Sequence, residues 1–214
     1  MSEIVLMADA RVAGVPVREC GEPLVDAREF LLVDRRLQDD SDGYFSLRQG
    51  VLERLRRAEA ALPTGMRFLV VEGYRPLALQ RRYFDEYARG LRVEHGDWTE
   101  EQVRSAASRF VSPVEIAPHS AGAAVDLTLV DGEGNELDLG TPMNASPEES
   151  GGRCYTASGG ISAGARELRG VLGGALESVG LVNYPTEWWH WSFGDRYWAL
   201  ISGADSACYA LIEG

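Results

Sequence analysis

Hydrophobic positions in the first half of the chain recur at intervals of three and four residues, which is the spacing of amphipathic helices. Between Ser46 and Pro63 this pattern predicts a helix with Ser46 as its N-cap and Pro63 as its stop. The same spacing predicts helices over residues 76–90 and 99–110, the second with acidic residues in its first turn and Thr99 as its cap. We expect the helices over residues 76–90 and 99–110 to lie at the periphery.

Short apolar runs rich in branched side chains predict the strands. Residues 67–72 (RFLVVE) and 123–130 (AAVDLTLV) have this composition. The sequence Asp-Gly-Glu-Gly-Asn after the second run is typical of a hairpin turn, so we expect residues 136–139 to pair back on it. Residues 30–33 predict a further short strand, and residues 39–43 a turn rich in Asp, Ser and Gly.

The C-terminal third combines one clear helix with a segment rich in tryptophan. Ser162 is expected to cap a helix over about residues 163–179, which Gly180 ends and which we take to be the last helix. Residues 183–193 (NYPTEWWHWSF) contain three of the five tryptophans, so we predict a strand or turn packed over the core. The Gly-, Ser- and Pro-rich stretch 140–164 is interpreted as a long loop.

This mixture of strands and helices predicts the α+β class, with a mostly antiparallel central sheet flanked by helices. The 214 residues, of which 45% are apolar and 25% charged, suit a single domain over residues 1–214. Residues 1–45 are weakly patterned, and no repeat or low-complexity block divides the chain.

The charge balance and the cysteines limit the expected partners and location. A formal net charge of −12, spread along the chain, would repel a phosphate backbone, so we expect no nucleic-acid partner. No apolar stretch reaches the roughly 18 residues of a spanning helix, and the N-terminus lacks a signal-peptide pattern. Cys20, Cys154 and Cys208 are widely spaced, which argues against a thiolate zinc site. We expect a cytoplasmic protein with no membrane contact, and no protein partner can be inferred.

Two of the three histidines stand in dense local patterns with carboxylates. His119 precedes Asp126 by seven residues, and His190 follows Glu187 by three. A catalytic zinc takes three protein ligands of these types and leaves a fourth position for water. A spare carboxylate beside the metal can accept the proton of that water. The four side chains thus offer a set for metal-assisted hydrolysis.

Spacing alone leaves other interpretations of these residues open. Positions seven apart on a straight strand face opposite sides, so His119 and Asp126 converge only if the chain bends, and Gly122 is the residue that permits a bend. Glu187 and His190 likewise need a tight turn. Either pair taken alone is more often a hydrogen-bonded structural pair than a metal site.

Four motifs occur in the order and spacing of a known family: Glu72-Gly73-Tyr74-Arg75-Pro76, the segment from His119 to Asp126, Gly140-Thr141-Pro142, and Glu187-Trp188-Trp189-His190. In this combination the chain resembles the D-alanyl-D-alanine dipeptidases of the VanX type, which belong to a larger group of zinc D,D-peptidases. The resemblance spans roughly residues 47–197. It implies the hedgehog-like D,D-peptidase fold, one zinc ion per chain, and hydrolysis of a small D-amino-acid dipeptide, with D-Ala-D-Ala as the leading candidate.

The resemblance also implies roles for individual residues. His119, Asp126 and His190 would be the zinc ligands. Glu187 would be the catalytic base, and Arg75 the cation that stabilises the scissile carbonyl oxygen as it becomes an oxyanion. A guanidinium is always charged and presents fixed donors, which suits that role on physical grounds too. Arg75 without the other motifs would more often form a surface salt bridge.

The chain departs from the family pattern near the expected substrate position. VanX-type enzymes carry an Arg two residues after the first ligand histidine, where Ala121 stands here, and tend to carry Ser near the position of Pro118. The family's Phe-Asp, whose Asp helps to hold the substrate's free ammonium, is replaced by Met143-Asn144. A neutral amide anchors an ammonium more weakly than a carboxylate does.

The candidate substrate contacts are Asn144, Tyr155 and Trp189. Glu148 or Glu149 is a possible substitute for the missing carboxylate, although acids in a loop are as readily explained as solvated side chains. Aromatic residues at such density are also more often core than contact.

Two alternatives to a dipeptidase stay open. One is a D,D-carboxypeptidase that acts on longer cell-wall peptides and does not require a free amine. The other is a non-catalytic binding module on the same fold, stabilised by zinc, against which the presence of Glu187 and Arg75 counts. The sequence contains no Gly-rich phosphate loop and no G-x-S-x-G motif, which argues against nucleotide binding and serine hydrolysis.

Overall fold

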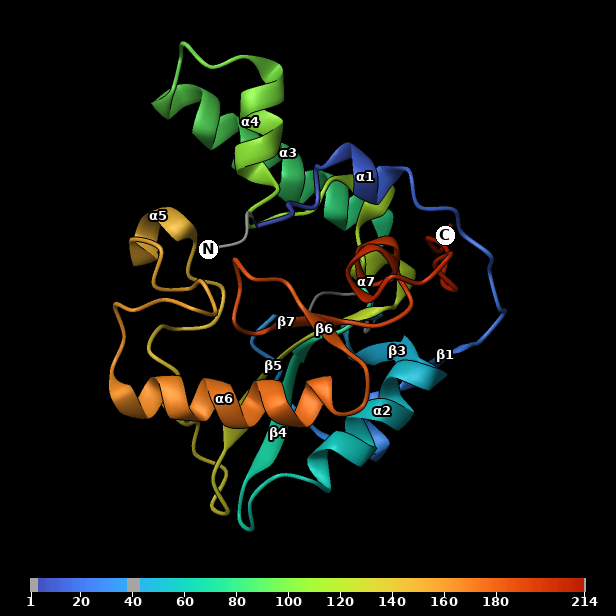
Figure 1. The fold of residues 1–214 in the computed structure, drawn as a ribbon, viewed down its shortest axis with the longest axis vertical. Helices are drawn as coiled ribbons and strands as arrows, with labels where there is room; N and C mark the ends of the chain where they lie inside the picture. Colours follow the sequence, from blue (N-terminus) through green and yellow to red (C-terminus); the bar gives the residue numbers. More distant parts are fainter. Residues whose placement is uncertain (1–3, 38–42, 214) are drawn as a thin grey trace.

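The computed structural model of the chain describes residues 4–37 and 43–213 and has a five-stranded sheet at its centre (Figure 1). The strands follow the order β2 (Leu32–Val33), β4 (Arg67–Glu72), β5 (Ala124–Val130), β7 (His190–Ser192) and β6 (Val182–Asn183). The pair β2–β4 is parallel, and the other three neighbouring pairs are antiparallel. All residues of β5 are buried, as expected for a central strand covered on both faces.

Two groups of helices flank this sheet (Figure 1). α2 (Gln49–Glu59) and α6 (Ala163–Glu177) pack against each other, and their apolar residues form the main hydrophobic core together with the sheet. α3 (Leu77–Glu94) and α4 (Glu100–Ala107) pack against each other and share a separate small apolar cluster. The second pair is therefore peripheral to the main core.

The remaining elements are short. They are α1 (Ala10–Ala13), β1 (Leu24–Asp26), β3 (Ser46–Arg48), α5 (Pro147–Ser150), α7 (Arg196–Ser202), and 3-10 turns at Ala27–Glu29, Gly43–Phe45, Val114–Ile116 and His119–Ala121. β1 and β3 form an antiparallel pair of their own. The C-terminal segment returns to the N-terminal one, where the amide of Cys20 donates to the carbonyl of Cys208 (3.0 Å). Two cysteines that are far apart in the sequence thus lie on adjacent segments.

The structure confirms the α+β class and most of the predicted elements. β4 and β5 match the two expected central strands, and α3, α4 and α6 match three of the expected helices. Thr99 caps α4 in a capping box, and Ser162 caps α6. The tryptophan-rich segment contributes β7 and the turn before it, and Trp188, Trp189 and Trp191 are at most 2% exposed.

The predicted start of the first long helix is wrong. Ser46 begins β3 instead of capping a helix, and α2 starts at Gln49, after an N-cap residue, Arg48, that makes no side-chain capping bond. β3 forms because residues 46–48 pair with β1. That partner is distant in the sequence, so no local pattern indicates it.

Three further expectations differ from the structure. Residues 136–139 form no strand, and the hairpin expected after β5 is reduced to a single bridge between Val130 and Glu136. α6 is not the last helix, because α7 follows it with Asp195 as its N-cap. The strand expected at residues 30–33 is shortened to β2. The turn expected at residues 39–43 lies outside the described residues except for its last position.

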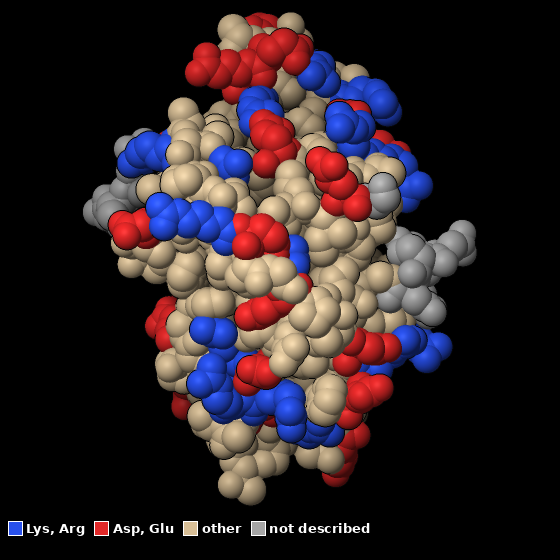
Figure 2. Space-filling view, turned by 90° about the vertical axis from the view of Figure 1, so that its right-hand side faces the viewer, with Lys and Arg blue, Asp and Glu red and all other residues tan. Residues whose placement is uncertain are grey.

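Charged side chains of both signs are interspersed on the face shown in Figure 2. In the described part of the chain, no helix is long and apolar enough to cross a membrane. The longest, α3, has 18 residues and carries charged side chains along its length.

Candidate metal centre

The chain bends sharply just after His119. Residues His119–Ala121 form a 3-10 turn, and Gly122 follows with a φ of +66°, in the left-handed region that glycine adopts without strain. This bend allows the side chains of His119 and Asp126 to converge, as the sequence analysis required. Nδ1 of His119 lies 2.6 Å from the carbonyl oxygen of Gly73, so a backbone acceptor at the end of β4 fixes the ring orientation.

Asp126 and His190 come from neighbouring strands. In the register of β5 and β7 they lie directly opposite each other. Oδ1 of Asp126 is 2.9 Å from Nδ1 of His190, and both side chains are buried. The antiparallel pairing therefore brings together two residues that are 64 positions apart in the sequence.

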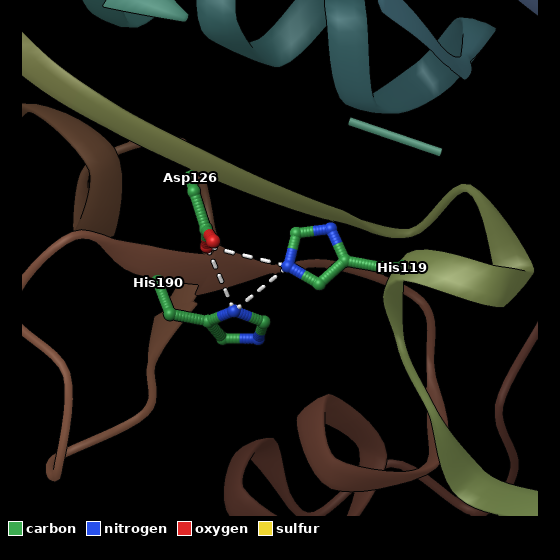
Figure 3. A group of neighbouring side chains, drawn as sticks. All are labelled: His119, Asp126 and His190. Carbon is green, nitrogen blue, oxygen red and sulfur yellow. Dashed lines mark hydrogen bonds and ion pairs between the residues drawn. The ribbon is translucent and has the colours of Figure 1, made fainter. Parts of the chain in front are cut away.

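Three side-chain atoms face a common point in the interior (Figure 3). Nε2 of His119 lies 3.1 Å from Nδ1 of His190 and 3.3 Å from Oδ1 of Asp126. Ligand atoms of a tetrahedral zinc with bonds of about 2.0–2.1 Å lie roughly 3.3 Å apart. The triangle formed by His119, Asp126 and His190, called the triad below, therefore has the dimensions to hold one metal ion.

The charge states of the triad suit a cation. Burial opposes ionisation of Asp126, but His119 and His190 outweigh it and lower the pKa of this carboxyl. Burial lowers the pKa of His190. Burial also acts to lower the pKa of His119, but the charge and hydrogen bond of Asp126 raise it overall. Carboxylates bind metals in the ionised state and imidazoles in the neutral state. At His119, a metal ion would compete with a proton for the imidazole nitrogen.

Glu187 lies beside the triad but outside it. Its Oε2 is 3.9 Å from Nδ1 of His190, and the side chain is buried. The tight turn that this pair required is present, because the amide of His190 donates to the carbonyl of Glu187 (3.2 Å). Burial raises the pKa of Glu187 well above its usual range, and the charge of Asp126 adds to this effect. A raised pKa suits a carboxyl group that has to take up a proton during a reaction.

Arg75 follows β4 and forms a buried two-point ion pair with Glu72. Its Nε and one terminal nitrogen each lie 2.6 Å from a carboxylate oxygen of Glu72, and the other terminal nitrogen donates to Gln80 (2.8 Å). Burial works against the guanidinium charge, but Glu72 outweighs it and raises the pKa of Arg75. A guanidinium has five N–H donors, so two are left after these three bonds.

One cavity of about 320 Å³ contains all five of these residues in its wall. Its apolar lining consists of Leu37, Tyr83, Tyr87, Phe110 and Val111, and its further polar residues are Glu72, Glu86, Ser112 and Asn144. Asn144 has a φ of +60° and is the one non-glycine residue with positive φ in the described part of the chain. Asparagine tolerates this conformation better than most residues do.

The peptidase M15 family, described as "D-ala-D-ala dipeptidase", matches residues 46–203, a range that contains every residue of the triad together with Glu187 and Arg75. The chain belongs to this family. As a peptidase M15 family member it is a peptidase of the D-Ala-D-Ala dipeptidase type.

Two curated relatives carry the same description. A D-alanyl-D-alanine dipeptidase of Synechocystis sp. is 29% identical over 86% of this chain and 87% of the relative. A D-alanyl-D-alanine dipeptidase of Escherichia coli is 38% identical over 34% of this chain and 35% of the relative. Among solved structures, the chain is similar to the LdcB LD-carboxypeptidase, with 16% identity and a TM-score of 0.44, over 89% of this chain and 76% of that one.

Two of the residues expected to contact substrate lie elsewhere in this peptidase M15 family member. Trp189 is fully buried in the main core, and Tyr155 packs against the same core. Neither belongs to the lining of the triad cavity, whereas Asn144 does. Apart from Leu37, the apolar wall comes instead from α3 and the segment after α4, a region in which the sequence predicted only peripheral helices.

Glu148 and Glu149 have other partners in this fold. Glu148 pairs with Arg109 (2.7 Å) and accepts a hydrogen bond from Tyr87. Glu149 completes a capping box with Ser146 at the start of α5. Neither glutamate lines the cavity, so neither replaces the carboxylate that the family carries at the position of Asn144.

Proposed function

We propose that this protein is a zinc-dependent dipeptidase that hydrolyses a small D-amino-acid dipeptide, with D-Ala-D-Ala as the leading substrate. The observation that carries the proposal is the position of Glu187. Its carboxylate shares a cavity with the triad, and its Oε2 lies 3.9 Å from Nδ1 of His190. A structural zinc site is closed by protein ligands, whereas a catalytic one keeps an open position beside a general base.

His119, Asp126 and His190 would hold the ion, with Nε2, Oδ1 and Nδ1 as the ligand atoms. When bound, zinc supplies a Lewis acid that activates water and polarises the scissile carbonyl. The hydrogen bond of His119 to Gly73 keeps the proton of this imidazole on Nδ1 and leaves Nε2 free to coordinate. Two neutral imidazoles and one carboxylate would neutralise only one of the two charges of a bound zinc ion, so the ion would keep its Lewis acidity.

Glu187 would act as the general base and then as the general acid. Its carboxylate takes the proton of the attacking water and returns it to the amine of the departing residue. Burial favours this second state, because it stabilises the protonated carboxyl relative to the ionised one. The role requires a side chain near the triad that does not coordinate, and Glu187 meets that condition.

Arg75 would stabilise the negative charge that develops on the carbonyl oxygen. Glu72 and Gln80 hold its guanidinium in place, so the two remaining N–H donors need no rearrangement during the reaction. Fixed donors of this kind typically lower a barrier by about 3–4 kcal/mol.

The acid-rich cavity suits a substrate that carries a free ammonium group, which supports the dipeptidase. A D,D-carboxypeptidase is the second candidate, and Asn144 is the observation that favours it. A neutral side chain at this place does not demand a charged amine on the substrate.

We further propose that the chain forms one domain and works in the cytoplasm, since its three free cysteines suit a reducing compartment.

The test is hydrolysis of D-Ala-D-Ala, L-Ala-L-Ala and N-acetyl-D-Ala-D-Ala, each before and after removal of metal with a chelator. We expect cleavage of D-Ala-D-Ala alone, loss of activity in protein shown to be metal-free, and recovery on addition of Zn²⁺. Preferred cleavage of the acetylated substrate would establish the carboxypeptidase. Full activity in protein shown by elemental analysis to contain no metal would contradict the proposal.

A further inference from the structure

Among the buried side-chain atoms that have no hydrogen-bond partner in the described part of the chain, three belong to β7 or to the N-cap residue of α7. They are Nε2 of His190, Oγ of Ser192 and Oδ2 of Asp195. The three residues are at most 3% exposed. Buried polar groups are nearly always paired with protein or with ordered water, so three unpaired groups within six residues call for an explanation.

Asp195 is held in a fixed orientation by one of its two oxygens. Oδ1 accepts hydrogen bonds from the amides of Tyr197 (2.8 Å) and Trp198 (3.1 Å) and so caps α7. Oδ2 is left over and lies in the same buried region as Ser192 and His190. Burial raises the pKa of Asp195, while the side chain of Ser192 and the charge of the His190 imidazole act to lower it.

His190 needs a partner on the side that faces away from the triad. Its Nδ1 points to Asp126 and His119, so a neutral ring that binds metal through Nδ1 must carry its proton on Nε2. Imidazoles that bind metal almost always donate this second N–H to a carboxylate, a carbonyl or a water. His119 already has such a partner in Gly73.

We propose that Asp195 is a positioning residue for His190, acting through a buried water that accepts the Nε2 proton of His190 and donates to Oδ2 of Asp195. Ser192 provides a third partner for the same water. A buried water typically makes about three hydrogen bonds, which matches the three unpaired atoms. This arrangement fixes the ring orientation and the tautomer that presents Nδ1 to the ion. The inference rests on the proposed ligand role of His190.

The decisive variant is Asp195→Asn. Asparagine is as good an N-cap as aspartate, so α7 is retained, but one carboxylate oxygen is replaced by an amide that donates instead of accepting. We expect zinc affinity, measured by competition with a chromophoric chelator, to fall about 10- to 100-fold. In metal-free protein, ¹⁵N chemical shifts should show His190 changing from the Nε2–H form to a mixture of tautomers.

Asp9→Asn is the matched control. Asp9 caps α1 through the amide of Arg11 (2.8 Å), so the variant makes the same chemical change at a cap that has no part in the triad. Zinc affinity and the His190 tautomer should stay as in the parent protein. Ser192→Ala removes one partner of the water and leaves the cap intact, so we expect a smaller loss of affinity in the same direction.

Zinc affinity within twofold of the parent in both Asp195→Asn and Ser192→Ala, with an unchanged His190 tautomer, would overturn the inference. Should Asp195→Asn fail to fold, as judged by circular dichroism, Asp195→Ser keeps a capping oxygen and tests the same loss of Oδ2. Failure of the proposed function is a separate result: the parent protein would then bind no zinc at all.

Discussion

Asp126 and His190 face each other across the antiparallel pair of β5 and β7, with Oδ1 and Nδ1 2.9 Å apart. The geometry of the triad is therefore fixed by sheet register. A shift of one residue would turn one of the two side chains to the opposite face of the sheet. The central, fully buried position of β5 makes such a shift costly, which gives the triad a rigid base.

Glu187→Gln should abolish turnover while zinc binding is retained. The amide keeps the size of the side chain but cannot take a proton, and general-base catalysis typically contributes about 10²–10⁴-fold. Because Glu187 lies outside the triad, zinc content should stay at one ion per chain. Steady-state hydrolysis and elemental analysis check both parts. Glu177→Gln, an exposed position on α6, is the control, and near-normal turnover in Glu187→Gln would refute the base assignment.

Arg75→Lys should lower kcat much more than it raises KM. Lysine keeps a positive charge beside Glu72 but loses the planar set of donors, so the oxyanion loses its fixed partners. We expect a loss of roughly 10²–10³-fold in kcat, as for removal of one oxyanion donor. Arg104→Lys makes the same change in an exposed pair with Glu115 and should leave the kinetics unchanged. An effect confined to KM would assign Arg75 to ground-state binding instead.

The central strands and the long helices could be predicted because their signals are local. The run of branched apolar residues in β4 and the capping residues of α4 and α6 identify these elements without any distant partner. β3 could not be found in this way, since Ser46 pairs with Asp26 across the chain. The turn residues after β5 are present as expected, but only one bridge forms beyond them.

The sequence allowed the residues of the candidate metal centre to be predicted, but not their arrangement in space. Chemistry selected His119, Asp126, Glu187 and His190, and the strand period showed that a bend was needed at Gly122. No sequence pattern indicated the apolar wall of the cavity, because the residues that α3 contributes to it also fit a peripheral helix. Glu72 could have been found, since it stands three residues before Arg75 and carries the opposite charge.

Gly122→Ala should destabilise the fold and weaken zinc binding together. Alanine at a φ of +66° costs about 1–2 kcal/mol, and its Cβ would lie 2.4 Å from Cδ2 of Leu24. The strain falls on the turn that carries His119. Gly134→Ala is the matched control, because Gly134 also has positive φ (+87°) but has no atom near the added Cβ. Urea unfolding should show a loss in both variants, whereas zinc affinity should fall only in Gly122→Ala; equal zinc affinity in both would contradict the prediction.

Stability should fall at alkaline pH, in part through Tyr184. Its hydroxyl donates to the carbonyl of Ser108 and accepts from the amide of Met7 (3.1 Å), and burial raises its pKa above the ordinary value. The unfolded chain releases this proton near pH 10 while the folded protein retains it, so the contribution is complete below that pH and is lost above it. For a single group the slope is about 1.4 kcal/mol per pH unit.

Urea unfolding at pH 8, 10 and 11 measures this slope. Tyr184→Phe should be less stable than the parent at pH 8, by about 1 kcal/mol for the lost hydrogen bonds, and should show a shallower fall between pH 10 and 11. A parent and a variant with parallel pH profiles would show that Tyr184 does not titrate differently in the folded state.

Asn144→Asp should shift specificity towards substrates with a free amine. The side chain lines the cavity, and aspartate tolerates the left-handed conformation of this residue about as well as asparagine does, so the fold should be unaffected. A carboxylate at this place would pair with the substrate's ammonium, and a charge-assisted bond is roughly twice as strong as a neutral one. We expect kcat/KM for D-Ala-D-Ala to rise about 10-fold, with no gain for N-acetyl-D-Ala-D-Ala. Equal gains for both substrates would show that residue 144 does not contact the amine, and the apolar wall formed by Tyr83, Tyr87 and Phe110 would then be the place to look for its binding site.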